Sequence, residues 1–537
     1  SLKDKIMALH VILVIDVGTQ SLRSSLVDEH GNICSMVTRT YDEPYKVPQS
    51  GYAEQDADFY YEEICRANNQ LREENPIMFS QVRSLVIATF RDTAVILDEN
   101  KNPIRPMILW LDQRMAELPG EKHIPLWNKM LFHIVGMWET VKLNSCRTGA
   151  QWLRENEPET WKKVKYYVPL GAYLNYKLTG ELKVSDSDIV GHYAFDYKNR
   201  RYYGKKALKY PVFGIDLEMN APLVKTGDVI GQITEKASKE SGIPTGINLI
   251  ASGSDKACEV LGDGCIEGSK ASISLGTACT IDIPSHKYIE PEAFLPSYGA
   301  AYPKDYNDEV QIYRGFWLLK WFTENFASVD DISEAKGKDI PLESLFDKKI
   351  EDIVPGSDGL MVQPYWGPGL KRPMARGAIV GFRDFQDKCH IYRASIEGIA
   401  FALREGMEEM DHRMHNKVKS LVVSGGGSRN DIVAQIIADI FNLPVYKTIT
   451  TESTTIGAAM AGFLAEGDVF HSNQDAVDSM VHYHKTFMPD KRNAKLYDQI
   501  YKQVYLKLYP KLNKLYEELD DLSKKERSIG ADGKRAK

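Results

Sequence analysis

Two segments far apart in the chain share one pattern of apolar and polar positions. The first, residues 11–38, reads VILVIDVGTQSLRSSLVDEHGNICSMVT, an apolar run followed by a Gly-Thr turn and two further strand-like runs. The second, Lys270 to Ile283, reads KASISLGTACTIDI, again with a Gly-Thr pair between two apolar runs. Such runs, broken by glycine, predict strands joined by tight turns. Two copies of one strand–turn–strand unit indicate two related lobes.

The remaining pattern alternates helices and strands, which is typical of an α/β protein. Helices are predicted over Asp56 to Glu73, Tyr173 to Gly180, Arg393 to Met410, Ile432 to Phe441 and Glu452 to Gly462, and a C-terminal helix near Ala494 to Leu519. Strands are predicted over Val82 to Phe90, Ala94 to Leu97 and Ser420 to Ser424. Ile243 to Ile250 is predicted to be a turn that leads into a strand, and Ile104 to Trp110 is a further short apolar run. The charged tail, Lys524 to Lys537, is predicted to be disordered.

The first Gly-Thr turn carries groups that can bind phosphate and a metal. Glycine lets the backbone come close to a ligand, and the neighbouring N–H and O–H groups can bond phosphate oxygens. Asp16, at the end of the first run, suits Mg²⁺ held through water. An ordinary β-hairpin with a polar turn is the alternative. No GxxxxGK[ST] motif occurs, and Gly262-x-Gly264 lacks the third glycine of a dinucleotide-binding fingerprint.

A third glycine-rich segment, Ser424-Gly-Gly-Gly-Ser-Arg-Asn430, lies between a predicted strand and a predicted helix. The N-terminus of a helix offers free N–H groups to an anion or a nucleotide. A tight strand-to-helix loop would need glycine too, but three in succession exceed that need and favour binding.

Composition narrows the class of protein. The 537 residues are enough for two large domains. A net charge of −7 argues against nucleic acid as the main partner. No apolar run approaches the ~20 residues that span a bilayer, and no signal-peptide pattern is found. The seven cysteines form no CxxC pair, which favours reduced thiols over a zinc site. We therefore expect a cytoplasmic enzyme without a membrane partner.

Four ordered motif regions resemble the FGGY family of carbohydrate kinases, within the actin–hexokinase–Hsp70 superfamily. They are Asp16-Val-Gly-Thr-Gln-Ser-Leu-Arg23, Gly253-Ser-Asp-Lys256, Leu275-Gly-Thr277, and Ser424 to Asn430 with Glu452 to Gly462. The segments Leu360 to Gly381 and Ser185 to Asp188 also resemble stretches of the family. The similarity covers about residues 10–500.

The resemblance implies an α/β fold with two actin-like (ribonuclease H-like) domains flanking a cleft for ATP and sugar. The expected lobes are residues 7–265, with the sugar-binding elements and first phosphate motif, and residues 266–490, with the second phosphate motif and adenosine site. Residues 491–537 would form the C-terminal helix and tail. The implied cofactors are ATP and Mg²⁺.

The resemblance also implies roles for single residues. Asp255 is the candidate general base; capping the following helix is its alternative role. Asp16 would hold Mg²⁺ through water, with Asp255 as a possible second contributor. The phosphate ligands would be Thr19, Gln20, Arg23, Gly276 and Thr277, and the adenosine side would be lined by Gly426, Gly427 and Asn430.

The expected sugar contacts are Arg91, Asp92, Trp110, Asp112 and Asp255. An Arg–carboxylate pair offers donors and an acceptor to vicinal hydroxyls, although Arg91 and Asp92 could instead form a structural salt bridge. The chain departs from family members at Asn144, where glycerol kinases have Tyr, and at Lys256. A lysine there could lower the pKa of Asp255 and contact phosphate, or point to solvent.

The implied reaction is ATP-dependent phosphorylation of a hydroxyl of a small sugar or polyol, preferably a ketopentose such as xylulose or ribulose. Glycerol or another short polyol is the alternative substrate. A non-catalytic ATP-binding regulator on the same fold, or an Hsp70-like ATPase module, is the alternative from another class. Dimers are common among symmetric assemblies, and a homodimer is the oligomer considered, but no segment of the sequence marks an interface.

Overall fold

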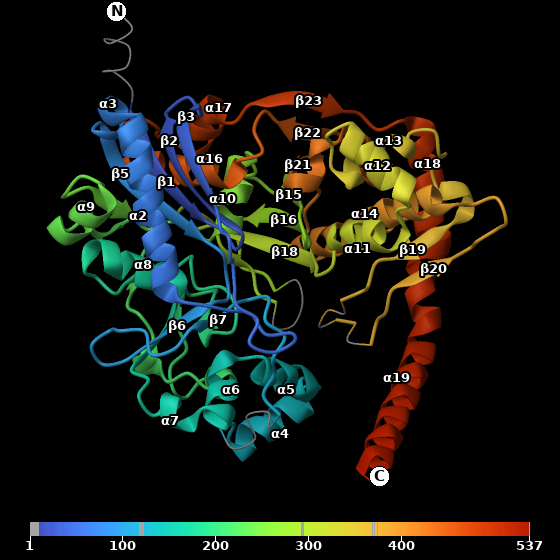
Figure 1. Ribbon diagram of the computed structural model, residues 1–537, viewed down its shortest axis with the longest axis horizontal. Helices are drawn as coiled ribbons and strands as arrows, with labels where there is room; N and C mark the ends of the chain where they lie inside the picture. The colour runs from blue at the N-terminus through green and yellow to red at the C-terminus, as the bar shows by residue number, and fades with distance from the viewer. Residues whose placement is uncertain are drawn as a thin grey trace, which may run out of the picture. The chain divides into compact units, whose positions relative to one another are not determined.

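The computed structural model describes residues 10–117, 123–290, 295–367, 369, 371–372 and 374–535, with side chains through residue 525. The chain divides into two compact units (Figure 1). Unit 1 comprises residues 1–266, 284–307 and 452–482, and unit 2 comprises residues 267–283, 308–451 and 483–537. The units are therefore discontinuous, unlike the lobes expected from the sequence. Residues 7–9 of the expected first lobe and residues 368, 370 and 373 of the Leu360–Gly381 segment lie outside the described residues.

The main sheet of unit 1 is built around the first motif. Its order is β13-β14-β5-β1-β2-β3, with β1 antiparallel to β2 and parallel to β5. The strands are β1 (Val11–Val17), β2 (Ser21–Asp28), β3 (Ile33–Thr40), β5 (Val82–Thr89), β13 (Val229–Gln232) and β14 (Asn248–Ile250). This confirms the strands predicted around Asp16. The turn predicted before Ile250 and the strand it leads into are both observed, the strand as β14.

Strand β1 is buried on both faces, which explains its continuous apolar run. Val11, Leu13 and Ile15 belong to the same apolar core as helix α2 (Ala57–Glu74). Ile12 and Val14 belong to a second core, with helix α16 (Ser453–Glu466). The two faces of one strand thus take alternate residues, as a pleated strand requires.

Helix α16 joins unit 1 because it packs on α10 (Asp255–Gly262), β1 and β5. Glycines allow the close approach: a Cβ at Gly457 would collide with the carbonyl of Cys258, and one at Gly262 with that of Ser453. The small residues of the predicted Glu452–Gly462 helix therefore have a packing function. They also place Glu452 next to the first motif.

The other helices of unit 1 surround this sheet or form a helical region below it in Figure 1. They are α3 (Pro76–Phe79), α4 (Leu126–Ile134), α5 (Trp138–Cys146), α6 (Gly149–Asn156), α7 (Pro158–Trp161), α8 (Leu170–Thr179), α9 (Glu235–Ser241) and α17 (Asn473–Met480), with 3₁₀ turns η1 (Tyr210–Phe213) and η2 (Leu217–Met219). Gly180 ends α8 with a φ of 76°, which confirms the predicted glycine cap.

Short strands complete unit 1. They are β4 (Glu54–Gln55), β6 (Ala94–Leu97), β7 (Met107–Ile108), β8 (Tyr166–Pro169), β9 (Val184–Ser185), β10 (Phe195–Asp196), β11 (Arg201–Tyr202), β12 (Leu223–Val224) and β17 (Tyr298–Gly299). Strand β6 has the predicted bounds, whereas the run from Ile104 to Trp110 forms only the short β7. After β7 the chain turns, and this turn carries Trp110 and Asp112.

Unit 2 repeats the pattern of unit 1. Strand β15 is antiparallel to β16 and parallel to β21, just as β1 is antiparallel to β2 and parallel to β5. The strands run in the order β18-β16-β15-β21-β22-β23. Their bounds are β15 (Lys270–Leu275), β16 (Cys279–Ser285), β18 (Tyr306–Ile312), β21 (Ser420–Ser424), β22 (Val445–Thr448) and β23 (Tyr483–Phe487), with a separate pair β19 (Met361–Gln363) and β20 (Ala378–Val380). The repeat inferred from the two Gly-Thr turns is confirmed.

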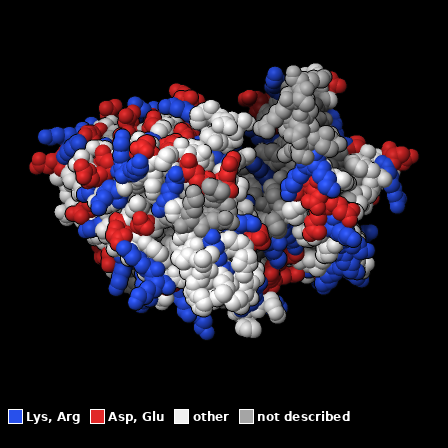
Figure 2. All heavy atoms as spheres, turned by 90° about the horizontal axis from the view of Figure 1, so that it is seen from below, with Lys and Arg blue, Asp and Glu red and all other residues white. Residues whose placement is uncertain are grey.

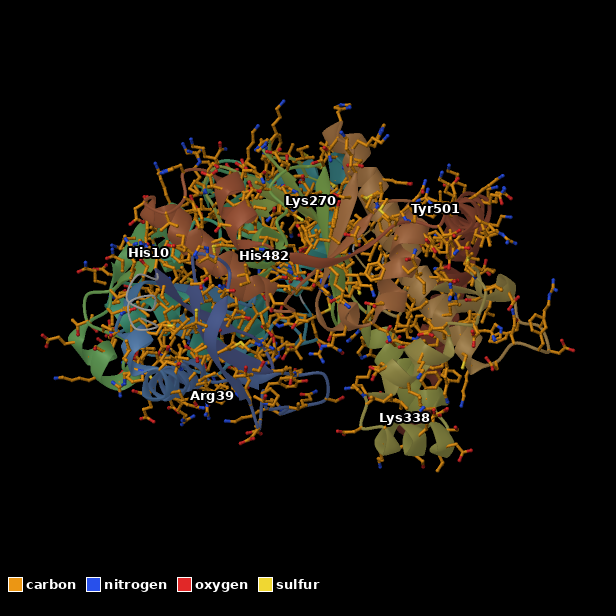
Figure 3. The ribbon with its side chains drawn as sticks, turned by 90° about the horizontal axis from the view of Figure 1, so that it is seen from above. His10, Arg39, Lys270, Lys338, His482 and Tyr501 are labelled. Carbon is orange, nitrogen blue, oxygen red and sulfur yellow. The ribbon has the colours of Figure 1, made fainter. Side chains whose placement is uncertain are left out.

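The start of β15 is held by an aromatic contact. The ammonium group of Lys270, labelled in Figure 3, lies 5.0 Å from the ring centroid of Tyr483 and 5.6 Å from that of Tyr446. Tyr483 begins β23 and Tyr446 lies in β22, so this contact joins the inner strand to the edge of the sheet.

The helices of unit 2 are α11 (Trp317–Phe326), α12 (Val329–Gly337), α13 (Leu342–Lys349), α14 (Lys388–Met414), α15 (Asp431–Phe441), α18 (Lys491–Ile500) and α19 (Leu506–Arg535). The shorter turns are η3 (Ser357–Gly359), η4 (Gly426–Arg429) and the π-helical turn η5 (Tyr501–Tyr505). The predicted disorder after Lys524 is not observed as far as Arg535, because that segment continues α19. Lys524 pairs with Asp520 one turn earlier, at 2.5 Å, which supports the helix.

Two general expectations can be compared with the described residues. None of the helices in them is long and apolar enough to cross a membrane. Figure 2 shows lysine, arginine, aspartate and glutamate side chains interspersed over the face it draws. Positively and negatively charged side chains are mixed on this face, whereas a nucleic-acid-binding protein has a continuous basic face.

Candidate active site

Asp16 lies near the end of β1 with an exposed fraction of 8%. Its partner in the β1–β2 register is Arg23, whose Nη1 lies 3.8 Å from Asp16 Oδ2. Arg23 Nε also lies 3.1 Å from Glu452 Oε2, at the start of α16. Arg23, expected to bind phosphate, is therefore placed between two carboxylates.

The surroundings of Asp16 favour a bound cation. Burial raises the pKa of Asp16 to about 7, Asp255, Glu452 and Glu259 contribute in the same direction, and the charge of Arg23 lowers it. Where carboxylates outnumber cations, further negative charge is disfavoured, and a bound metal ion reduces the repulsion between the carboxylates. No group of three or more His, Cys, Asp or Glu side chains in the described part of the chain is arranged to ligate a metal directly. Few protein ligands and several waters are what Mg²⁺ accepts, so Asp16 fits the expected role.

Asp255 is the first residue of α10, but it does not cap that helix. The N-cap is Ser254, whose Oγ accepts the Ala257 N–H at 3.3 Å. Asp255 Oδ1 accepts the N–H of Lys256 at 2.7 Å. Burial raises the pKa of Asp255, while the charges of Arg91 and Lys256 lower it. A buried carboxylate with a raised pKa is a suitable proton acceptor.

Lys256 does not simply point to solvent. Its Nζ lies 2.8 Å from Glu259 Oε2, and both side chains are largely buried. Its charge lowers the pKa of Asp255, as one of the two sequence-based alternatives expected.

A further carboxylate, Asp188, was not among the predicted site residues. The negative charge of Asp255 contributes to raising the pKa of Asp188 well above its usual value, although burial is the main cause. A Cβ on Gly171, in the first turn of α8, would lie 2.5 Å from Asp188 Oδ2. The Ser-Asp-rich stretch that ends at Asp188 was the only sequence signal for it.

The first Gly-Thr turn is tight and contacts Trp110. The N–H of Gly18 donates to the Ser21 carbonyl at 3.0 Å, and a Cβ on Gly18 would lie 2.8 Å from that oxygen. The Thr19 hydroxyl accepts the indole N–H of Trp110 at 2.9 Å. Gln20 is exposed beside it. The structure therefore brings one expected phosphate ligand and one expected sugar contact together.

Asp92 pairs with a histidine that sequence reasoning missed. Asp92 has a φ of 55°, and its carboxylate accepts the backbone N–H of His192 at 2.9 Å and lies 2.8 Å from the ring Nδ1. Burial lowers the pKa of His192, but Asp92 outweighs it and the net pKa is raised. Arg91 instead lies over the ring of Tyr298, 5.2 Å from its centroid. The sequence gives no signal for this pair, because His192 and Asp92 are 100 residues apart in the chain although they are neighbours in the structure.

Asp112, one of the expected sugar contacts, lies in a buried network of ion pairs and hydrogen bonds. Its side chain is 1% exposed and lies 2.8 Å from Arg114 Nη2. Its Oδ2 also accepts the backbone N–H of Ala53 at 2.6 Å. Arg114 in turn lies 2.8 Å from Glu54 Oε1. With its oxygens occupied in a buried network, Asp112 is placed to hold the loop that carries Trp110.

In unit 2 the second Gly-Thr turn is fixed by the start of α11. The carbonyls of Gly276 and Thr277 accept the backbone N–H groups of Phe316 and Trp317 at 3.1 and 3.2 Å. The glycine loop after β21 lies beside the end of β15, because a Cβ on Gly425 would lie 3.0 Å from the Leu275 carbonyl oxygen.

The next two glycines of that loop differ. A Cβ on Gly427 would collide with the ring of Phe316, whereas one on Gly426 would meet no atom within 4 Å. Gly427 is therefore required by packing, and Gly426 borders open space where a ligand can approach the backbone.

Asn430, expected on the adenosine side, is the N-cap of α15. Its Oδ1 accepts the Ile432 N–H at 3.3 Å. It also hydrogen-bonds to Asp347, whose pKa burial raises to about 6 while Asn430 and Tyr392 oppose the rise. Asn430 thus fixes the helix N-terminus that the glycine loop enters.

Comparison with known proteins decides the family. Models of the N-terminal and C-terminal domains of the FGGY family of carbohydrate kinases match residues 11–262 and 271–466. The chain belongs to the FGGY family of carbohydrate kinases. The sugar kinase YgcE of Escherichia coli K12 is 27% identical over 493 residues, 92% of each chain. Xylulose kinase of Lactococcus lactis is 27% identical over 496 residues, 91% of this chain and 94% of that protein.

The fold agrees with this membership of the FGGY family. The crystal structure of gluconate kinase from Lactobacillus acidophilus matches with a TM-score of 0.80 at 20% identity, covering 95% of this chain and 100% of that one. The two-domain, actin-like α/β fold implied by the motifs is confirmed. The individual roles of the residues described above stay predictions.

Proposed function

We propose that this carbohydrate kinase transfers the γ-phosphoryl group of ATP to a hydroxyl of a ketopentose such as xylulose or ribulose. The proposal rests on Asp255, which is buried and has a raised pKa. Ser254 caps the helix that follows, so the Asp255 carboxylate is not used as the cap. The names of similar proteins, xylulose kinases among them, support the substrate class.

Asp255 takes the proton of the attacking hydroxyl in this proposal. Burial raises the pKa of the Asp255 carboxylate, which makes it a better proton acceptor than an exposed carboxylate, while the charges of Arg91 and Lys256 favour its ionised form. Arg91, whose charge acts on Asp255, is positioned to orient a sugar hydroxyl. The Asp92–His192 pair and Trp110 complete the proposed sugar contacts.

Phosphate binding is divided between the two motifs. Thr19, Gln20 and Arg23 act in unit 1, and Gly276 and Thr277 act in unit 2. Asp16 would hold Mg²⁺ through water, with Asp255 as a second contributor, and the ion would neutralise phosphate charge. The open backbone at Gly426, with Gly427 and Asn430 behind it, would accept the adenosine side.

The domain roles follow the same division. We assign sugar binding and the first phosphate motif to the N-terminal FGGY domain, within residues 7–265. We assign the second phosphate motif and the adenosine site to residues 266–490. Helix α16 belongs to residues 266–490 in the sequence but packs in unit 1. The C-terminal range therefore contributes Glu452, which pairs with Arg23 of the first phosphate motif.

Two alternatives make different predictions. A glycerol or short-polyol kinase would use the same base and would differ only in the preferred acceptor. A non-catalytic ATP-binding regulator has no need of a buried base, and Asp255 counts against it. A homodimer is the proposed oligomer, and its interface is considered below.

The test is ADP release from Mg·ATP with a panel of ketopentoses, aldoses, aldonates and polyols, using the wild-type chain and Asp255→Asn. Strong stimulation by a ketopentose, lost in the variant, is expected. Stimulation by glycerol alone would replace the substrate class. Bound ATP without stimulation by any acceptor would support the regulator instead.

A further inference from the structure

The C-terminal helix α19 has one side docked on unit 2 and another side that exposes leucines. The docked side begins in the preceding π-helical turn with Tyr501, which is labelled in Figure 3 and stacks on Phe401 at 6.0 Å between ring centroids. Tyr505 stacks on the same ring at 5.3 Å. Farther along, Tyr516 is 6% exposed and donates to Gln363 Oε1 at 3.4 Å. These tyrosines fix the rotation of the helix.

A row of leucines begins at the docked surface, where Leu508 lines a hollow with Tyr505 and Tyr509, and continues to one side of it. Leu508, Leu512, Leu515, Leu519 and Leu522, here called the leucine stripe, follow one another at spacings of four, three, four and three residues. Leu515, Leu519 and Leu522 are 51%, 49% and 58% exposed. In Figure 1 the C-terminal half of α19 extends beyond β19, β20 and α18 without another element of unit 2 beside it.

Alternate spacings of four and three are the pattern of helices that pack against a second helix along a seam. Leu508 and Leu512 are partly buried. Single exposed leucines are common, but three in succession on one side of about 10 Å of helix are not. The stripe therefore fits a helical partner better than it fits solvent.

We propose that the leucine stripe of α19 pairs with the same stripe of a second copy of this chain, with the two helices antiparallel. In a two-fold arrangement Leu512 lies opposite Leu515 of the second copy, and Leu508 lies opposite Leu519 of the second copy. Leu522 lies beyond these pairs at each end, opposite Tyr505, whose ring is buried against Phe401. The four leucines from Leu508 to Leu519 each find an apolar partner.

Charge complementarity selects this orientation. Lys511 and Glu518 border the stripe on the side away from Tyr516, and both are exposed. The antiparallel pairing brings Lys511 of each copy against Glu518 of the other, which gives two symmetric ion pairs. A parallel pairing would place Lys511 against Tyr516 and Glu518 against Ser523, with no opposite charges.

The test is the mass of the full chain in solution. A seam of about two heptads is short, so we expect a monomer–dimer equilibrium that shifts between about 1 and 100 µM protein. Sedimentation velocity over this range should show the dimer. The double variant L515E/L519E should be monomeric at the highest concentration and should retain its melting temperature and its kinase activity. L126E, which changes a leucine that is 83% exposed on α4, is the matched control and should dimerise normally.

A charge exchange tests the orientation. K511E and E518K should each weaken the dimer by about threefold to tenfold, because two attractive pairs become repulsive. The double variant K511E/E518K should restore it. A monomeric wild type, a dimer that survives L515E/L519E, or failure of the double exchange to restore association would each overturn the proposal. A monomeric wild-type chain that sediments with anionic phospholipid vesicles would assign the stripe to a lipid surface instead.

Discussion

The indole N–H of Trp110 donates a hydrogen bond of 2.9 Å to the hydroxyl of Thr19. The backbone N–H of Trp110 is held as well, by the hydroxyl of Thr93 at 3.1 Å. The loop after β7 is thereby tied to the first Gly-Thr turn of the kinase, so a proposed sugar contact and a proposed phosphate ligand depend on one another.

Trp110→Phe keeps a ring in this position and removes only the N–H donor. We expect kcat/KM for the sugar to fall about threefold to tenfold, the effect of one lost hydrogen bond. The melting temperature should hardly change, because the side chain is 43% exposed. Steady-state kinetics with varied sugar gives the measurement. Trp127→Phe, on the exposed side of α4, is the control, and equal kinetics in the two variants would argue against the coupling.

Asp255→Asn removes the proposed base and keeps its shape. Loss of general base catalysis lowers kcat by about 10²- to 10⁴-fold. The affinity for ATP should remain, which equilibrium binding of the nucleotide would measure. Glu259→Gln is the matched control, since Glu259 lies close enough to raise the pKa of Asp255. If Asp255→Asn kept more than about a tenth of wild-type kcat, Asp255 would not be the base.

Magnesium affinity should depend on pH through Asp16. The pKa of Asp16 is raised to about 7, so below that value Mg²⁺ must displace a proton. The affinity should rise by up to about tenfold per pH unit as pH approaches 7, and level off above it. Isothermal titration at several pH values measures this. Asp16→Asn should bind weakly without that slope, and a wild-type affinity independent of pH would contradict the assignment.

The same shift has a consequence for stability without metal. An acid whose pKa is higher in the folded state than in the unfolded state lowers the free energy of unfolding as pH rises from the lower value to the higher one. For Asp16 this interval runs from 3.8 to about 7. Thermal unfolding should show Asp16→Asn gaining stability over the wild type as pH rises through it. If the difference in stability between Asp16→Asn and the wild type were the same at pH 3.8 and at about pH 7, Asp16 would not titrate in this interval.

Asp112→Asn separates a structural role from a substrate contact. The Asp112–Arg114 pair is buried, with 1% and 3% of the two side chains exposed. Breaking it should lower the free energy of unfolding by about 3 kcal/mol. Chemical denaturation measures this loss. Glu157→Gln, which affects the more exposed pair with Arg105, should cost less than about 1 kcal/mol. Unchanged stability with a large loss of kcat/KM would instead support Asp112 as a sugar ligand.

The sequence predicted the parts of the site that are local in the chain. Asp16, Gly18 and Thr19 are neighbours at one strand end, and Ser424 to Asn430 joins one strand to the next helix, so turn chemistry and periodicity locate them. The strand pairs around both Gly-Thr turns were predicted for the same reason.

What the sequence could not provide depends on contacts between distant segments. His192 meets Asp92 across 100 residues, and Glu452 reaches Arg23 only because the glycines of α10 and α16 let those helices approach. The burial of Asp112 and its bonds to Arg114 and Ala53 likewise have no trace in a single sequence. The presence of residues 452–482 in unit 1 follows from the same packing of α16.

The two adjacent glycines 426 and 427 give the sharpest test of the adenosine site. Gly427→Ala places a methyl group against the ring of Phe316 and should lower the melting temperature, because neither the ring nor the loop can move freely. Gly426→Ala meets no protein atom within 4 Å and should leave the melting temperature unchanged. If ATP lies against Gly426, however, that methyl group occupies ligand space, and the KM for ATP should rise with little change in the KM for sugar. Measuring both constants in both variants distinguishes packing from binding. A Gly426→Ala variant with wild-type KM for ATP would remove the glycine loop from the proposed nucleotide site.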